Sequence, residues 1–146
     1  MRTLASAYIL GLISWTLLEY LLHRFVFHRF RGLVGSFHLE HHAAPRNIKY
    51  LFVRPPYAIG VSALAIAAIW GITGNFIQTA GLMAGIWTGY LYYESVHYRI
   101  HFTSGEGRLI ARQRRAHFRH HFHDARRCFG VTTPLWDYVF RTTSSA

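Results

Sequence analysis

The sequence predicts an all-α fold, an integral membrane helical bundle with about three transmembrane helices, and two observations predict it. Of the 146 residues, 51% are hydrophobic and only 15% are charged, which is unusually apolar for a folded domain. Three apolar stretches, each close to the roughly 20 residues that cross a hydrocarbon core, alternate with polar or basic segments. The length suits a single domain, residues 1–146.

The first expected span covers residues 4–22, where Glu19 is the only charge. No small-residue cleavage site follows it and its exit, "HRFVFHRFR", is basic, so it is not expected to be a cleaved signal. The second span, 57–72, opens at Pro55 and Pro56, which lack a backbone N–H and suit a helix start. The third, 76–93, carries glycines every four residues, which predicts close helix packing rather than substrate contact.

Charge predicts the orientation of these spans. Of the 16 Lys and Arg residues, 15 lie in segments 24–54 and 99–141, and the turn "GITGN" has none. Because basic loops stay on the cytoplasmic side, both segments are expected there, with an external amino terminus and a cytoplasmic carboxyl terminus. Segment 99–141 has too many cations to be buried, so it is expected to form interfacial helices facing anionic membrane lipids, not nucleic acid.

Ten of the 11 histidines form four groups: His23 and His28; His38, His41 and His42; His97 and His101; His117, His120 and His121. Spacings of three and four residues place side chains on one face of a helix, so three groups each offer one imidazole-bearing face. A spacing of five separates His23 from His28 by about 140° on a regular helix. His28 is therefore expected to reach inward from a bend or from beyond the helix end.

Metal binding is the expected role of these groups. Each lies just beyond a predicted span, so folding brings them together on the cytoplasmic side, and crowded imidazoles without a metal would repel one another once protonated. Ten nitrogens suit two ions, and imidazole accepts iron, zinc, copper or nickel. A transporter would hold its ions near the membrane midplane, where these spans are apolar.

The single Cys128 can form neither an intrachain disulfide nor a thiolate site and is expected to be buried.

Polar partners are expected to orient the ligands, because a ligating histidine usually donates its second ring N–H to an acceptor. The candidates are Glu19, Glu40, Glu94, Asp137 and His123. Surface exposure is the alternative for His123, and surface exposure or helix capping for Asp137. A site with glutamate ligands is a further alternative, although only six acidic residues stand against ten grouped histidines.

The order H-x4-H, H-x2-H-H, H-x3-H, H-x2-H-H resembles the fatty acid hydroxylase superfamily, the membrane-bound, histidine-rich di-iron oxygenases that include sterol desaturases. Segments "WTLLEYLLHRFVFH", "PPY", "HYRIH", "HFRHHF" and "FGVTTPLWDYVF" extend the likeness over most of the chain and look most like fatty acid 2-hydroxylases. The resemblance implies that the ten grouped histidines hold two iron ions, which zinc can replace in a purified sample. It also implies that O₂ and two electrons hydroxylate a lipid acyl chain.

Two departures from the family follow. The 146 residues hold no haem-binding electron-donor domain, so a separate donor protein is expected, and they lack room for the usual fourth span, so a homo-oligomer is expected to complete the bundle. Other readings stay open at this point. One is a sterol or lipid desaturase, or a carotenoid hydroxylase, of the same superfamily; another is a membrane protein that binds zinc without redox turnover.

Overall fold

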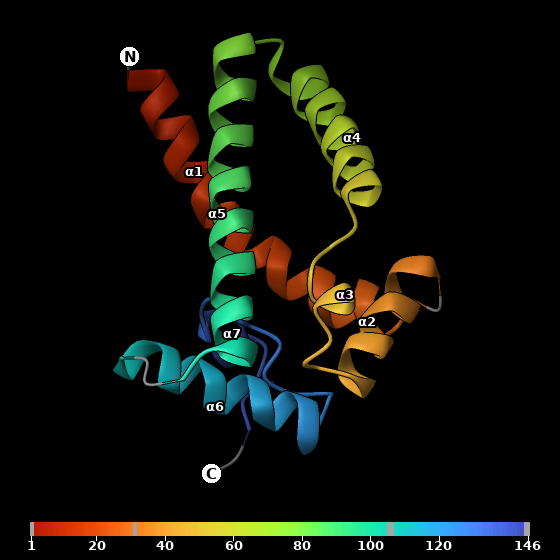
Figure 1. The fold of residues 1–146 in the computed structure, drawn as a ribbon. Helices are drawn as coiled ribbons and strands as arrows, with labels where there is room; N and C mark the ends of the chain where they lie inside the picture. Colours follow the sequence, from red (N-terminus) through yellow and green to blue (C-terminus); the bar gives the residue numbers. More distant parts are fainter. Residues whose placement is uncertain (1, 31, 105–106, 145–146) are drawn as a thin grey trace. The chain divides into compact units, whose positions relative to one another are not determined.

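The structure is a computed structural model that describes residues 2–30, 32–104 and 107–144 (Figure 1). Every regular element in these ranges is a helix, which confirms the all-α class. In chain order they are α1 (Arg2–Leu21), the π-helix η1 (Leu22–Phe27), α2 (Leu33–Ala43), α3 (Ile48–Leu51), α4 (Pro55–Thr73), α5 (Phe76–Phe102), α6 (Arg108–Phe122) and α7 (Leu135–Val139).

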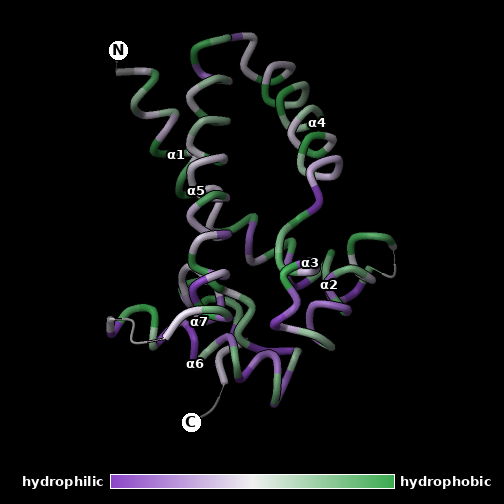
Figure 2. The backbone as a smooth tube through the Cα atoms, viewed as in Figure 1, coloured by the Kyte–Doolittle hydropathy of each residue, from purple (hydrophilic) through white to green (hydrophobic). Residues whose placement is uncertain are grey.

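Two stretches are long and apolar enough to cross a membrane, Thr3–Phe27 and Ile48–Thr73. Helix α4 begins at Pro55, as the missing N–H predicts, and ends at Gly74 in the left-handed conformation. No α4 residue is buried, and Figure 2 shows hydrophobic residues along this helix, as a lipid-facing helix requires. Helix α5 contains the predicted third span, but within the described ranges only the two stretches named above are long and apolar enough to cross a membrane. The third span and the orientation stay predictions.

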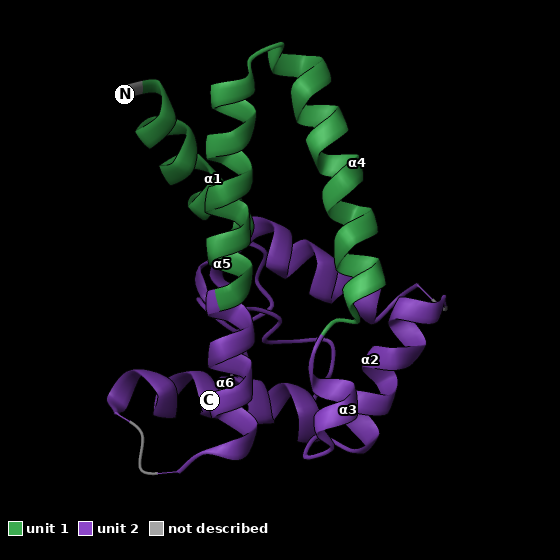
Figure 3. Cartoon of the chain, turned by 45° about the horizontal axis from the view of Figure 1, so that its top comes forward, with its two compact units in different colours: residues 1–15, 53–91 green, residues 16–52, 92–146 purple. Residues whose placement is uncertain are grey.

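The chain divides into two compact units, each built from two separate stretches (Figure 3). Unit 1 comprises residues 1–15 and 53–91, and unit 2 comprises 16–52 and 92–146. Helices α1 and α5 therefore each contribute to both units. The ten grouped histidines all fall in unit 2, while unit 1 contains α4 and the apolar parts of α1 and α5.

Within unit 1, the glycines of α5 pack against α1. A Cβ added to Gly85 would lie 2.1 Å from the carbonyl oxygen of Tyr8, and one added to Gly11 would lie 2.2 Å from that of Leu82. Both distances are far too short for a side chain, so the two backbones touch. At Gly89 a Cβ would meet the ring of Trp15 at 2.5 Å. The prediction that the glycine stripe serves helix packing is confirmed.

Candidate metal centre

Two clusters of five histidines lie in unit 2, and the ligand nitrogens within each cluster are all within 4.8 Å of one another. We call them site A and site B. Site A comprises His23, His28, His38, His42 and His120. Site B comprises His41, His97, His101, His117 and His121. The structure thus brings together the ten histidines that the sequence groups, and it divides them equally.

Each H-x2-H-H motif contributes to both sites. Its first and last histidines, four residues apart, belong to one site and the middle one belongs to the other. On α2, His38 and His42 join site A and His41 joins site B; on α6, His117 and His121 join site B and His120 joins site A. Around the axis of an α-helix, residues i and i+4 lie about 40° apart, whereas i+3 lies about 60° from i and about 100° from i+4. The middle histidine can therefore face the other site. The motif therefore ties the two sites together.

A π-helix brings His23 and His28 to the same site despite their spacing of five residues. Residues 22–27 form η1, and His28 follows as its C-terminal cap. Hydrogen bonds in a π-helix run from residue i to i+5, so one turn takes more residues than in an α-helix and a side chain five positions on returns to nearly the same face. The rings of His23 and His28 lie 5.1 Å apart, both in site A. The inward bend expected at His28 is a change of helix type.

The spacing of the ring nitrogens fits metal ligation. Five Nε2···Nε2 separations are short: 2.9 Å for His28–His120, 3.1 Å for His28–His38, 3.1 Å for His38–His42, 3.0 Å for His41–His97 and 2.9 Å for His101–His117. Two nitrogens bound to one ion at about 2.1 Å and at right angles would lie ~3 Å apart. A neutral imidazole carries one N–H, so five nitrogens pointed at one another cannot all be satisfied by hydrogen bonds alone.

The electrostatic environment keeps these imidazoles neutral. Burial, together with the neighbouring His101 and His42, lowers the pKa of His41 to about 3. Burial, together with neighbouring histidines, likewise lowers the pKa of His120 to about 3 and that of His42 to about 4. A neutral ring keeps the nitrogen lone pair that a metal ion needs. At neutral pH the two sites therefore carry little positive charge of their own and could hold metal ions.

Backbone carbonyls orient two ligands of site A. The Nδ1 of His23 lies 2.6 Å from the carbonyl oxygen of Phe129, and the Nδ1 of His120 lies 2.7 Å from that of Arg127. A carbonyl only accepts, so each Nδ1 carries the proton and donates it. Each Nε2 is then left with its lone pair, and in His120 that atom lies among the other nitrogens of site A. These acceptors could not be predicted from the sequence, because every residue has a backbone carbonyl.

Glu19 and Asp137 act on that same segment, residues 127–132, which we call the clamp loop. Glu19 was a candidate partner for a ligating histidine, but its carboxylate accepts the amides of Val131 and Thr132 and the hydroxyl of Thr132. Three donors occupy the Glu19 carboxylate, and the Nδ1 of His23 donates to the Phe129 carbonyl. Asp137 is buried, which argues against surface exposure, and accepts two clamp-loop amides. Both carboxylates therefore bind the clamp loop, and the carbonyls of that loop in turn bind the histidines.

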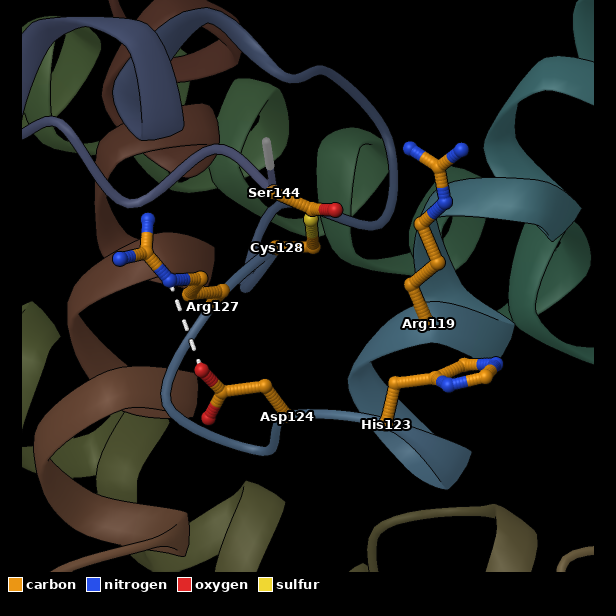
Figure 4. Close-up of a pocket in the computed structure, with 6 residues that line it drawn as sticks. All are labelled: Arg119, His123, Asp124, Arg127, Cys128 and Ser144. Carbon is orange, nitrogen blue, oxygen red and sulfur yellow. Dashed lines mark ion pairs between the residues drawn. The ribbon is translucent and has the colours of Figure 1, made fainter. Parts of the chain in front are cut away.

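The remaining candidates separate by burial. Glu94 is buried on α5, one turn before His97, and Glu40 is exposed on α2. His123 is exposed at the end of α6 and belongs to neither cluster. It lines a cavity of about 140 Å³ together with Arg119, Asp124, Arg127, Cys128 and Ser144. Figure 4 shows these six residues. Cys128 is buried, as predicted.

Comparison with known proteins gives consistent results. Rat (Rattus norvegicus) fatty acid 2-hydroxylase is 35% identical over 148 residues, which cover 92% of this chain and 38% of the relative. Ceramide very long chain fatty acid hydroxylase scs7 of Schizosaccharomyces pombe is 32% identical, with 92% of this chain and 41% of the relative covered. Dihydroceramide fatty acyl 2-hydroxylase FAH2 of Arabidopsis thaliana is 30% identical, with 90% and 58% covered. The chain thus spans about 40 to 60% of the length of these relatives.

A solved structure described as full-length scs7p, with only the hydroxylase domain visible, has the same fold. It matches with a TM-score of 0.85 and 26% identity over 97% of this chain and 56% of that one. The model of the family described as fatty acid hydroxylase matches residues 8–142, nearly the whole sequence. With both histidine clusters inside the matched range, the chain belongs to the fatty acid hydroxylase family.

Proposed function

We propose that this protein hydroxylates carbon 2 of a long lipid acyl chain, in a free fatty acid or a ceramide. The observation that carries the proposal is the division of ten histidines into two five-nitrogen clusters. The names of the relatives, fatty acid 2-hydroxylase and dihydroceramide fatty acyl 2-hydroxylase, supply the substrate class and the carbon. The balanced reaction is R–H + O₂ + 2 e⁻ + 2 H⁺ → R–OH + H₂O, with the electrons delivered by an electron-donor protein.

Side-chain chemistry alone cannot perform this reaction, because an aliphatic C–H bond is beyond the reach of a protein acid or base. Two iron ions, one in each site, would supply the redox chemistry with O₂. The ten grouped histidines would hold the ions; burial keeps His120 neutral, and the Phe129 and Arg127 carbonyls fix the orientation of His23 and His120. Glu94, buried one turn before His97, is proposed as a polar partner of site B.

The place of the site along the chain supports attack near the polar end of the lipid. His23 and His28 follow directly on the apolar residues of α1, and His97 and His101 follow the apolar part of α5. Ligands at the ends of spanning helices would lie at headgroup level, where carbon 2 of an acyl chain also lies. The charge asymmetry favours the cytoplasmic side for both sites, and interfacial placement of α6 beside anionic lipid.

Isotopically labelled O₂ tests the proposal. Membranes containing the protein, a reduced electron donor and a long-chain fatty acid or ceramide should yield a 2-hydroxylated lipid whose new oxygen carries the label, and the His120→Ala variant should yield none. Unlabelled product, or a double bond as the only product, would contradict the hydroxylase proposal and favour another activity of the superfamily. Bound zinc, with no product after loading with iron, would favour a zinc protein without redox turnover.

A further inference from the structure

The clamp loop is held by every backbone amide from residue 128 to residue 132. The Cys128 amide donates to the Thr142 carbonyl at 2.8 Å, and those of Phe129 and Gly130 donate to the two oxygens of Asp137 at 2.9 and 2.8 Å. The next two amides, of Val131 and Thr132, donate to one oxygen of Glu19 at 2.6 and 2.9 Å. Five consecutive amides with acceptors leave the loop very little freedom.

The acceptors are themselves fixed. Thr142 donates its hydroxyl to Asp137 at 2.7 Å, and the Tyr20 hydroxyl lies 2.9 Å from that same Thr142 oxygen. Tyr20 and Asp137 are both almost completely buried, at 0% and 2% exposure, so water does not compete for these groups. Gln113 of α6 donates to the Thr132 carbonyl at 2.8 Å and holds the far end of the loop.

The loop transmits this order to site A alone. Its Arg127 and Phe129 carbonyls receive the Nδ1 protons of His120 and His23, which belong to site A. In site B, the buried Nδ1 atoms of four histidines have no hydrogen-bond partner within the described parts of the chain: His41, His97, His117 and His121. The two clusters have equal numbers of histidines, but the clamp-loop carbonyls fix the rings of two histidines in site A and of none in site B among the described residues.

We infer that the two metal positions are unequal, and that the clamp loop, with Glu19 and Asp137 as positioning residues, makes site A the tighter one. Ligands held in the binding orientation lose less freedom when the ion arrives, and a hydrogen bond to Nδ1 makes the ligating nitrogen more basic. The inference rests on the proposed function only in taking the two clusters as metal sites. Burial alone would not favour site A, because four of the five site B histidines are buried against three of five in site A.

Calorimetric titration of the chelated full-length protein with Zn²⁺, in lipid nanodiscs, tests the inference. The wild type should bind two ions in two resolved steps. Glu19→Gln and Asp137→Asn should weaken the tighter step by about 10- to 100-fold, the usual effect of removing a partner of a ligand, and leave the weaker step within about twofold. Glu40→Gln, which neutralises an exposed carboxylate on α2, is the matched control and should change neither step.

Variants of the ligands assign the steps. His97→Ala should remove the weaker step, and His23→Ala should remove the tighter one. Two equal steps in the wild type, loss of the tighter step in His97→Ala, or equal weakening of both steps by Glu19→Gln would overturn the inference. A protein that binds two ions unequally but makes no hydroxylated lipid would refute the proposed function and leave this inference standing.

Hydrogen exchange provides a readout that does not depend on whether the variants fold. In the chelated wild type, the amides of residues 128–132 should exchange at least about tenfold more slowly than those of residues 124–127, because Cys128, Phe129 and Val131 are buried whereas residues 125–127 are exposed. Adding one equivalent of Zn²⁺ should protect α6 around His120 before α5 around His97. Equal protection of both helices, or rapid exchange throughout the clamp loop, would contradict the assigned role.

Discussion

Units 1 and 2 differ in which side chains they bury and which they expose. In unit 1, helix α4 exposes its apolar side chains and none of its residues is buried. In unit 2, most of the largest fully buried side chains are polar, with His41, His97, His117, His120 and Asp137 among them. One unit is stabilised where apolar surface can meet lipid, whereas the other buries groups that are costly to bury unless something binds them. From this difference it follows that the hydropathy of the sequence predicts the helices of unit 1, whereas the spacing of the histidines predicts the site in unit 2.

The largest expected effect comes from removing one ligand in unit 2. His41→Ala or His120→Ala should abolish hydroxylation and lower bound metal by at least one ion per chain, because each takes one of five nitrogens from a site. Product analysis together with metal quantification in the same preparation checks both losses. Retention of both metal and product would remove the basis for treating unit 2 as a metal centre.

Acid should destabilise unit 2 selectively. In the unfolded chain a histidine takes up a proton near pH 6.5, whereas folded His41 and His120 do so only near pH 3 because they are buried. Between these values the unfolded state binds more protons, so the free energy of unfolding falls as the pH falls. Each such histidine contributes about 1.4 kcal/mol per pH unit.

Unfolding of the chelated protein, followed by circular dichroism from about pH 7.5 to pH 5, measures this dependence. Stability should be nearly constant above pH 7 and should decline below about pH 6.5. His41→Ala should reduce the slope in the acid range. A stability independent of pH across this range would mean that the histidines are hydrated in the folded state.

Much of this contrast could be read from the sequence, for identifiable reasons. The i, i+3 and i+4 spacings place histidines on helix faces whatever the fold, so eight members of the clusters could be chosen in advance from spacing, and His23 and His28 could be added from their order in the four-group pattern. Their division between two sites could not be predicted, because His38 and His41 lie one turn apart on α2 and the fold decides which cluster each joins. The π-helix and the carbonyl acceptors could not be predicted either, since neither depends on a recognisable side-chain pattern.

A smaller effect is expected from breaking the helix contact in unit 1. Gly85→Leu should destabilise the protein by about 1–3 kcal/mol, because even its Cβ would overlap the Tyr8 carbonyl and force α1 and α5 apart. Gly60→Leu is the matched control: a Cβ on Gly60 of α4 meets nothing within 4 Å. Thermal unfolding in nanodiscs should separate the two variants. Equal stability would mean that the Gly85 contact contributes nothing to unit 1.

The smallest expected effect concerns His123, which tests where unit 2's polar interior stops. It lies two residues after His121 on the same histidine-rich segment, yet its side chain is exposed beside the cavity in Figure 4. His121→Ala should remove a site B nitrogen and weaken metal binding strongly, whereas His123→Ala should change metal content and product formation by less than about twofold, as expected of an exposed residue. Parallel measurements on the two variants compare an interior with a surface histidine only half a helical turn apart. A loss in His123→Ala as large as that in His121→Ala would extend the metal centre to the surface, and the interior defined by the four histidine groups would be too small.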